Sequence, residues 1–210
     1  MNKTTQVKEV IKRLKAKFPN PKIALNFATP FELMTAVILS AQCTDKRINM
    51  ITPALFARYP EVADYATADR EELEQLVKQS GFYHSKARYI QESAQMILAQ
   101  FGGKVPTNMK DLLTLPGVAR KTANVVISTL TDNHEGVVVD THVKRITKLL
   151  GLTKSADPKK IEQEMVAIVP KIEWRNFSHL LILHGRETCI ARRPRCHECI
   201  LLDICPRVGL

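Results

Sequence analysis

The architecture is indicated most directly by the segment Leu115-Pro116-Gly117-Val118-Ala119-Arg120-Lys121, which follows the short apolar pair Leu112-Leu113. Proline and glycine together predict a tight turn, and the residues after it predict a helix that begins near Arg120. The first N–H groups of such a helix lack backbone partners and lie at the positive end of its dipole, so they suit a phosphate oxygen. Backbone contacts of this kind hold DNA without reading its sequence. For a proline–glycine turn alone, a plain connection between two helices is the competing interpretation.

Helical periodicity extends from this turn in both directions along the chain. After Thr29, a capping residue, a proline at the first helical position and Glu32 for a capping box precede an almost wholly apolar run, which predicts a core helix. Only the isolated run Val137-Val138-Val139 resembles a strand. We therefore expect an all-α fold. Helices are expected over residues 7–18, 30–42, 69–79, 85–101, 120–130, 141–150, 158–169 and 174–184.

The composition excludes several classes of protein. The 210 residues include 31 Lys plus Arg and 21 Asp plus Glu, so the formal net charge is +10, and the sequence pI near 9.5 indicates a polyanionic partner. With 45% hydrophobic and 25% charged residues, the chain is expected to be globular. No apolar run reaches the ~18 residues needed to cross a bilayer, and residues 1–18 lack an apolar signal-peptide core. We therefore expect a cytoplasmic protein that makes no membrane contact.

Four of the five cysteines are clustered near the end of the sequence. They follow the spacing C-x6-C-x2-C-x5-C, and four thiolates in so short a segment suit zinc or an iron–sulfur cluster. Zinc ribbons usually supply two C-x2-C pairs, and here there is one. From the residues alone, zinc and an iron–sulfur cluster both remain open. Cys43 stands apart and is interpreted as a small apolar residue of the core. The clustered residues are Cys189, Cys196, Cys199 and Cys205.

Three arginines lie between the first two clustered cysteines. They are Arg192, Arg193 and Arg195. A solvated run of charge is the ordinary interpretation of such a group. A loop held at both ends by metal ligands, in a chain of charge +10, favours a rigid phosphate-binding loop instead.

Two of these motifs carry a family resemblance. Residues 115–121, together with the following Thr122-Ala123-Asn124-Val125-Val126, resemble the helix-hairpin-helix of the endonuclease III family of DNA base-excision glycosylases. The cysteine spacing is similar to that of the family's [4Fe-4S] cluster, and Ala119 stands where the family usually has a second glycine. The resemblance spans Phe31 to Cys205. It implies two helical lobes, a six-helix barrel domain with the hairpin over residues 22–134 and a [4Fe-4S] cluster domain over residues 1–21 and 135–210.

The resemblance assigns catalytic roles to Lys121 and Asp140. A lysine at this position in the family marks the bifunctional enzymes, whose neutral amine attacks the sugar C1′ of a damaged nucleotide. The segment Val139-Asp140-Thr141-His142 is similar to the family's second catalytic motif, whose aspartate stabilises positive charge developing on the sugar. Without the resemblance, Lys121 reads as a solvated lysine and Asp140 as a helix N-cap. The capping role and the catalytic role of Asp140 are compatible.

Further residues are implied to open the duplex and line the pocket. An extruded nucleotide leaves a gap that must be filled, and Leu39-Ser40-Ala41-Gln42 resembles the family segment whose glutamine fills it. Phe82 lies where the family presents a second apolar wedge, although a glycine followed by two aromatic residues also suits core packing. Ser40 and Asp45 match pocket positions, and His142 matches a position in the DNA cleft.

The function implied by the resemblance is base excision repair. The protein would remove oxidised pyrimidines from double-stranded DNA through a Schiff base and cut the strand 3′ to the abasic site by β-elimination. Its partner would be DNA containing damaged bases or abasic sites, and we expect a monomer associated with the nucleoid through DNA binding. The alternatives are a monofunctional or mismatch-specific glycosylase, a non-catalytic iron–sulfur protein that binds DNA or senses redox state, and a zinc-dependent nucleic-acid module.

Overall fold

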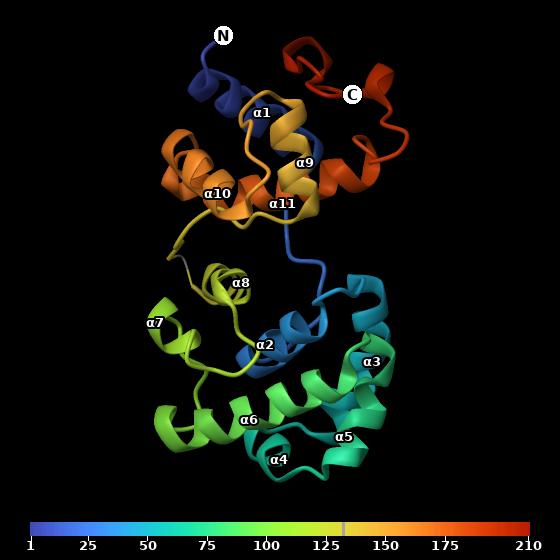
Figure 1. Ribbon diagram of the computed structural model, residues 1–210, viewed down its shortest axis with the longest axis vertical. Coiled ribbons are helices and arrows are strands. Elements are labelled where there is room, and N and C mark those ends of the chain that lie inside the picture. The colour runs from blue at the N-terminus through green and yellow to red at the C-terminus, as the bar shows by residue number, and fades with distance from the viewer. Residues whose placement is uncertain (132) are drawn as a thin grey trace. The chain divides into compact units, whose positions relative to one another are not determined.

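The computed structural model describes residues 1–131 and 133–210, and all of the regular structure in these residues is helical. The chain forms two compact units (Figure 1). Unit 1 combines Met1–Ile23 with His134–Leu210, and unit 2 is Ala24–Asn133. The expected all-α fold is confirmed. The run Val137-Val138-Val139 forms no strand.

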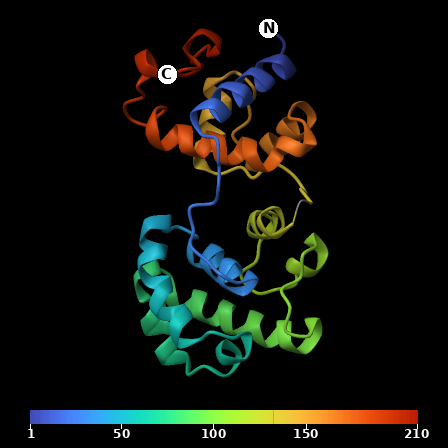
Figure 2. The ribbon, with the colours of Figure 1, turned by 180° about the vertical axis from the view of Figure 1, so that it is seen from behind.

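In the part of unit 2 that the structure describes, there are seven α-helices and a short 3-10 helix. The longest helix, α6, packs against α4 and α5 on one side and against α2 on another (Figures 1 and 2). The elements are α2 (Pro30–Leu39), α3 (Asp45–Arg58), α4 (Val62–Thr67), α5 (Arg70–Val77), η1 (Lys78–Ser80), α6 (Tyr83–Phe101), α7 (Met109–Leu112) and α8 (Arg120–Leu130).

The core helix α2 begins as its sequence predicts. The Thr29 hydroxyl accepts a hydrogen bond from the Glu32 N–H at 3.2 Å, and Pro30 is the first helical residue. From Phe31 to Leu39, every residue except Glu32 is buried. The helix ends at Leu39 rather than at the expected Gln42, because Gln42 adopts a left-handed conformation with φ of 56°.

The sequence analysis did not predict α3. Pro53 lies inside this helix and removes one backbone donor, which masks the helical pattern. Two features compensate for the proline. The Thr44 hydroxyl caps the helix by accepting from the Arg47 N–H at 3.3 Å, and one face buries Ile48, Ile51, Thr52 and Leu55.

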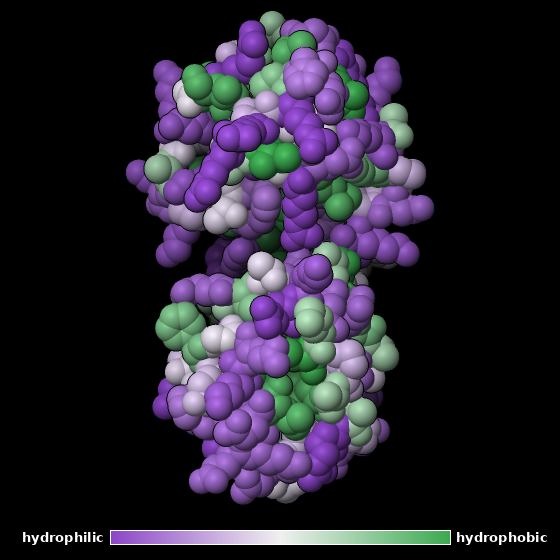
Figure 3. All heavy atoms as spheres, turned by 90° about the vertical axis from the view of Figure 1, so that its right-hand side faces the viewer, coloured by the Kyte–Doolittle hydropathy of each residue, from purple (hydrophilic) through white to green (hydrophobic). Residues whose placement is uncertain are grey.

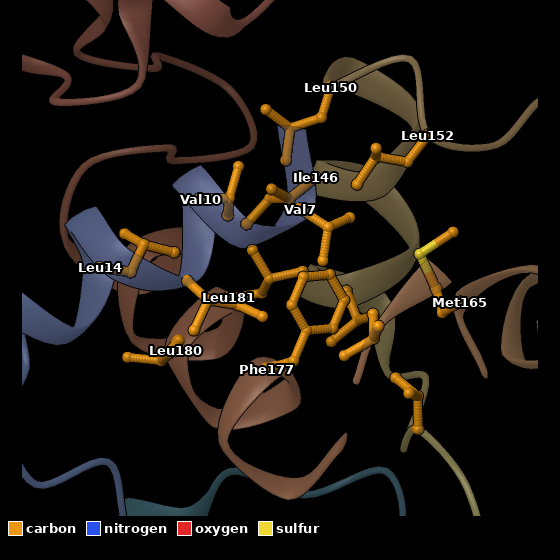
Figure 4. Packing of buried hydrophobic residues seen from close by; sticks show 14 of the residues in the cluster. Val7, Val10, Leu14, Ile146, Leu150, Leu152, Met165, Phe177, Leu180 and Leu181 are labelled. Carbon is orange, nitrogen blue, oxygen red and sulfur yellow. The ribbon is translucent and has the colours of Figure 1, made fainter. Parts of the chain in front are cut away.

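Unit 1 packs helices from the two ends of the sequence around a single core. Val7, Val10 and Leu14 of the first helix belong to the same buried cluster as Phe177 of α11 (Figure 4). Each of these four side chains is fully buried. The elements are α1 (Lys3–Lys17), α9 (Thr141–Leu149), α10 (Pro158–Ile168), η2 (Lys171–Glu173), α11 (Trp174–Glu187), η3 (Cys196–Glu198) and η4 (Leu202–Ile204).

Helix α1 also holds the segment that carries the clustered cysteines. The Gln6 side-chain amide donates to the carbonyl oxygens of Leu150 at 2.8 Å and Ile204 at 2.9 Å. The Arg13 guanidinium donates to the Ile200 carbonyl at 2.9 Å and pairs with the Asp203 carboxylate. The irregular end of unit 1 is therefore fixed by hydrogen bonds to a regular helix.

The surface is mainly hydrophilic on the face drawn in Figure 3, where apolar atoms appear in smaller groups. Over residues 1–131 and 133–210, no helix combines the length and apolar character that a membrane span requires.

Candidate functional site

Side chains of α6 contact the turn between α7 and α8 and hold it in place. Gly117 has φ of +75°, and a Cβ atom there would lie 2.8 Å from the Tyr89 side chain. Glycine is therefore required both by the backbone conformation and by the close approach of the ring. The Ser93 hydroxyl, on a buried side chain, donates to the Pro116 carbonyl at 2.9 Å. Tyr89 and Ser93 thus fix the turn to the longest helix of unit 2.

The same turn presents backbone groups to solvent. Leu115 and Val118 are buried and anchor it, whereas Gly117 and Ala119 are exposed. Ala119 is the N-cap of α8, and an alanine has no side-chain acceptor for the first N–H groups of the helix. Its φ of −83° and ψ of 168° are extended values that any residue adopts, so the missing glycine does not distort this turn.

Arg120 and Lys121 are the first two residues of α8, and both are exposed. Lys121 directly follows the exposed turn whose first helical N–H groups suit a phosphate. This is an accessible position for a nucleophile that must reach a sugar in DNA.

Two further exposed loops of unit 2 carry strained residues. Within the described part of the chain, only three residues other than glycine have positive φ, and they are Gln42 at 56°, Phe82 at 50° and Arg207 at 55°. Gln42 is exposed, and Phe82 is a large apolar side chain with 67% of its surface exposed. Both features are unusual for loops without a binding role.

The pocket positions lie next to the Gln42 loop. Ser40 is the C-cap of α2, and its hydroxyl donates to the Val37 carbonyl at 2.8 Å. Asp45 is the first residue of α3 and is half-buried. The two residues therefore flank the loop that carries Gln42.

In unit 1, Asp140 is the N-cap of α9. Its Oδ1 atom accepts a hydrogen bond from the Val143 N–H at 2.8 Å, and its side chain is half-buried. His142 is the second residue of the helix, and its Nδ1 atom lies 3.5 Å from a nitrogen of the Arg145 guanidinium. A Cβ atom on Gly185 would lie 2.6 Å from the same Nδ1 atom, so α11 passes close to this end of α9 only because residue 185 is glycine.

His179 interacts electrostatically with Asp140 and is uncharged at neutral pH. Burial, with the Arg175 charge as a smaller cause in the same direction, lowers the pKa of His179 to about 4, while the negative charge of Asp140 opposes the shift. At neutral pH His179 is therefore uncharged, and it does not neutralise the Asp140 carboxylate.

The four clustered cysteines line one pocket of unit 1. Its remaining lining is largely apolar and includes Ile146, Leu149 and Leu201. The pocket holds about 420 Å³ free of protein atoms, part of it open to solvent. All four thiols are free and half-buried. The lining cysteines are Cys189, Cys196, Cys199 and Cys205.

Burial raises the pKa of the Cys189, Cys199 and Cys205 thiols, so these sites need a cationic group to hold them as thiolates. Protein donors already reach two of them. The Arg145 guanidinium donates to the Cys189 sulfur at 3.3 Å, and the Leu201 N–H donates to the Cys199 sulfur at 3.4 Å. Hydrogen bonds to ligand sulfurs are typical of iron–sulfur sites.

A polynuclear cluster fits this pocket. The four cysteines line one hollow, which suits a cofactor that has several iron atoms of its own and takes one thiolate at each.

The three arginines extend from the loop between the first two of these cysteines. All three are exposed, and the loop is closed by a hydrogen bond from the Arg195 N–H to the Thr188 carbonyl at 2.9 Å. The Arg195 side chain also lies 4.0 Å from a Glu198 oxygen. Arg192 and Arg193 are therefore the better placed for phosphate, because part of the Arg195 charge is balanced.

Two models of known protein families match this chain, and together they cover parts of both units. A family model described as HhH-GPD superfamily base excision DNA repair protein matches residues 35–171, and one described as iron-sulfur binding domain of endonuclease III matches residues 189–205. The fold and the cysteine pocket thus define a helix-hairpin-helix protein of base excision DNA repair with an iron–sulfur domain.

The relatives extend over nearly the whole chain. An endonuclease III of Synechocystis sp. is 48% identical over 205 residues, which cover 98% of this chain and 94% of the relative. The chain belongs to the endonuclease III family. An endonuclease III of Escherichia coli K12 is 39% identical over 205 residues, which cover 98% of this chain and 96% of the relative.

Two solved structures share the fold closely. One is a non-covalent endonuclease III–DNA complex, with a TM-score of 0.91, and the other is a trapped endonuclease III–DNA covalent intermediate, with a TM-score of 0.90. Each is 40% identical to this chain, and each alignment covers 98% of this chain and 96% of the other. The protein is a base-excision repair DNA glycosylase with abasic-site lyase activity, it binds DNA, and its cofactor is a [4Fe-4S] cluster.

Within each unit, the structure brings several of the predicted site residues close to one another or onto a shared supporting helix. In unit 2, Lys121 adjoins the hairpin, and α6 supports both this hairpin and the loops of Gln42 and Phe82. In unit 1, Arg145 of α9 connects His142 with Cys189. The sequence analysis missed Arg145 and the supporting residues of α6, because their contacts join parts of the chain that no local pattern relates.

Proposed function

We propose that this enzyme removes oxidised pyrimidines from duplex DNA and that Lys121 is its nucleophile. The observation that carries the proposal is that Lys121 is exposed and is the second residue of α8, directly after the hairpin. The Lys121 Nζ, as the free amine, attacks C1′, the bond from C1′ to the base breaks, and the base leaves with a proton. The nitrogen lone pair then forms a double bond to C1′ as the bond from C1′ to the ring oxygen O4′ breaks and O4′ takes up a proton. The protonated imine that results acidifies the 2′ hydrogens. Loss of one of them expels the 3′ phosphate oxygen and cuts the strand.

Asp140 is proposed to supply the negative charge for this reaction. One carboxylate oxygen caps α9, and the other is not needed for the cap, so it can face a sugar that gains positive charge as the base leaves. The neutral state of His179 leaves this charge undiminished.

Gln42 and Phe82 are proposed to open the duplex. Phe82 stacks against the exposed bases, and Gln42 fills the space left by the extruded nucleotide. Ser40 and Asp45 line the pocket for the extruded base. This assignment is supported by the exposure of both wedge residues and by their left-handed backbone.

The remaining contacts are proposed to position the DNA. The hairpin of residues 115–120 binds phosphate through its backbone, and His142, Arg192, Arg193 and Arg195 add contacts from unit 1. Cys189, Cys196, Cys199 and Cys205 are the proposed cluster ligands. Residues 22–134 form the proposed barrel domain, and residues 1–21 and 135–210 form the proposed cluster domain. We further propose that the enzyme acts as a monomer on nucleoid DNA in the cytoplasm.

The experiment that tests this function uses a duplex with one thymine glycol. We expect release of the damaged base, cleavage 3′ to the lesion, and a covalent protein–DNA adduct when borohydride is added during the reaction. Duplexes with an oxidised purine or a mismatched thymine serve as controls and should react more slowly. Base release that leaves the strand intact until alkali is added would favour a monofunctional glycosylase. Binding without any base release would favour a non-catalytic protein.

The substitution Asp140→Asn separates capping from catalysis. Asparagine keeps an oxygen for the Val143 N–H, so the helix cap is retained, whereas the charge is lost. We expect single-turnover base release to slow by about 10²-fold to 10³-fold. The control is Asp157→Asn, which makes the same change at the N-cap of α10, where Asp157 accepts from the Lys159 N–H. Equal rates for wild type and Asp140→Asn would leave Asp140 with the capping role alone.

A further inference from the structure

A buried lysine lies at the start of the longest helix of unit 2. Lys86 of α6 is only 4% exposed, and it shares the buried face of the helix with Ile90, Ala94 and Ile97. A buried amine has lost its hydration and is retained at such a position only when hydrogen bonds replace the lost water. Burial is the main cause that lowers the pKa of Lys86.

The Lys86 amine joins the ends of two other elements. Its Nζ atom donates to the carbonyl oxygen of Leu39 at 2.8 Å and to that of Ser80 at 2.7 Å. Leu39 is the last residue of α2, and Ser80 is the last residue of η1. Carbonyl groups at helix C-termini lack intrahelical partners and attract cations. Lys86 therefore binds both ends at once.

These two ends lead directly into the loops that carry the proposed wedge residues. Gln42 lies three residues after Leu39, and Phe82 lies two residues after Ser80. Both residues have left-handed φ values, which persist only where surrounding contacts hold the backbone. A hydrogen bond of 3.0 Å from the Arg47 guanidinium to the Gln79 side-chain oxygen adds a second connection between the two segments.

We propose that Lys86 is a positioning residue that holds the Gln42 and Phe82 loops at a fixed spacing, so that both wedge residues enter the duplex together. This inference rests on the proposed role of Gln42 and Phe82 in opening the duplex. Lys86 itself is buried and does not touch the DNA. It acts through the two carbonyl groups, and the wedge is preorganised before DNA binds.

The matched control is Gln91 on the same helix. Gln91 is 7% exposed, and its amide donates to the Ala68 carbonyl at 2.6 Å, so it too links α6 to a neighbouring loop through a buried side chain. That loop carries no residue with a proposed DNA contact. Lys86→Met and Gln91→Met thus remove comparable buried polar contacts and differ in which loop they release.

The experiment compares two substrates under single-turnover conditions. On a duplex with thymine glycol, the wedge must help to extrude a base, whereas a duplex with a preformed abasic site has no base to extrude. For Lys86→Met we expect base release to slow at least about tenfold, since small displacements of positioning groups have effects of this size or larger. Cleavage at the abasic site should change less than about threefold, because no base has to be extruded from that duplex. A general loss of fold would instead reduce both activities alike. Gln91→Met should leave the ratio of the two rates at the wild-type value.

Two additional measurements keep the test decisive. Adding Lys86→Met to the Gln42→Ala/Phe82→Ala double variant should slow base release no further, because the wedge is already absent. Lys86→Gln, which retains a shorter donor, should fall between wild type and Lys86→Met, and it serves in place of Lys86→Met if that variant does not show the wild-type helical circular dichroism.

The outcomes separate this inference from the function on which it rests. Wild-type protein that acts on neither duplex would refute the proposed function. Active wild type together with unchanged or equally reduced rates for the Lys86 variants would refute the positioning role alone. A slower base release with preserved abasic-site cleavage, absent from Gln91→Met, is the result that the positioning role predicts.

Discussion

Lys121→Gln is expected to abolish the borohydride-trapped adduct and to slow strand cleavage by about 10³-fold or more, as happens when an enzyme loses its nucleophile. Glutamine has a similar length and cannot form an imine, and the exposed position of residue 121 accommodates the change without repacking. DNA affinity should fall only modestly, because the hairpin binds phosphate through backbone groups. Adduct formation is measured by gel electrophoresis of protein incubated with a labelled thymine glycol duplex.

The control for this variant is Lys110→Gln. Lys110 is an exposed lysine of α7, on the other side of the same hairpin, and its loss changes the net charge equally. It should leave both the adduct and the cleavage rate near their wild-type values. A Lys121→Gln protein that still forms the adduct would show that another amine is the nucleophile. An adduct lost equally in both variants would instead indicate a general effect of charge on DNA binding.

Cys199→Ser is expected to remove the [4Fe-4S] cluster. Cys199 is proposed as one of four ligands, and its sulfur is hydrogen-bonded by the Leu201 N–H at 3.4 Å. We expect the absorbance at about 400 nm to be lost and the iron content to fall from about four atoms per protein to less than about one. Because the four cysteines line a hollow that the cluster would fill, the pocket should then collapse or fill with water, and the melting temperature should decrease.

The matched control is Cys43→Ser, which removes a half-buried cysteine of unit 2. It should retain the absorbance and the iron. DNA affinity shows whether the cluster positions the arginine loop, since Arg192 and Arg193 lie between two proposed ligands. We expect weaker DNA binding in Cys199→Ser and unchanged binding in Cys43→Ser. Full iron content in Cys199→Ser would remove Cys199 from the ligand set, and zinc in the wild-type protein would contradict the cluster itself.

Some of the fold was predictable because it depends on neighbours in the sequence. The start of α2 follows from Thr29 and Pro30, since capping is a local hydrogen bond. The end of the same helix was predicted three residues too late, and α3 was not predicted at all. In these cases the local pattern was overridden by a left-handed residue in a loop held by distant contacts and by a proline tolerated within a helix that buries one face.

One supporting residue did leave a signal in the sequence. Lys86 occupies the position four residues before Ile90 on a face that is mainly apolar, and a lysine on such a face indicates a buried amine with a defined partner. The partners themselves could not be inferred. The Leu39 carbonyl lies 47 residues away in the sequence, and a carbonyl acceptor belongs to the backbone of every residue type.

The sequence by itself determined the features whose chemistry is written in adjacent residues. These are the proline–glycine turn, the helices that follow their caps, and the cysteine spacing, since turn formation, capping and ligand spacing act over a few residues. Only the tertiary structure decided that Tyr89 requires glycine at residue 117, that Ser93 holds the Pro116 carbonyl, and that the cysteines surround a pocket. The physical reason is that these contacts join segments far apart in the chain, and their geometry exists only once the helices have packed together.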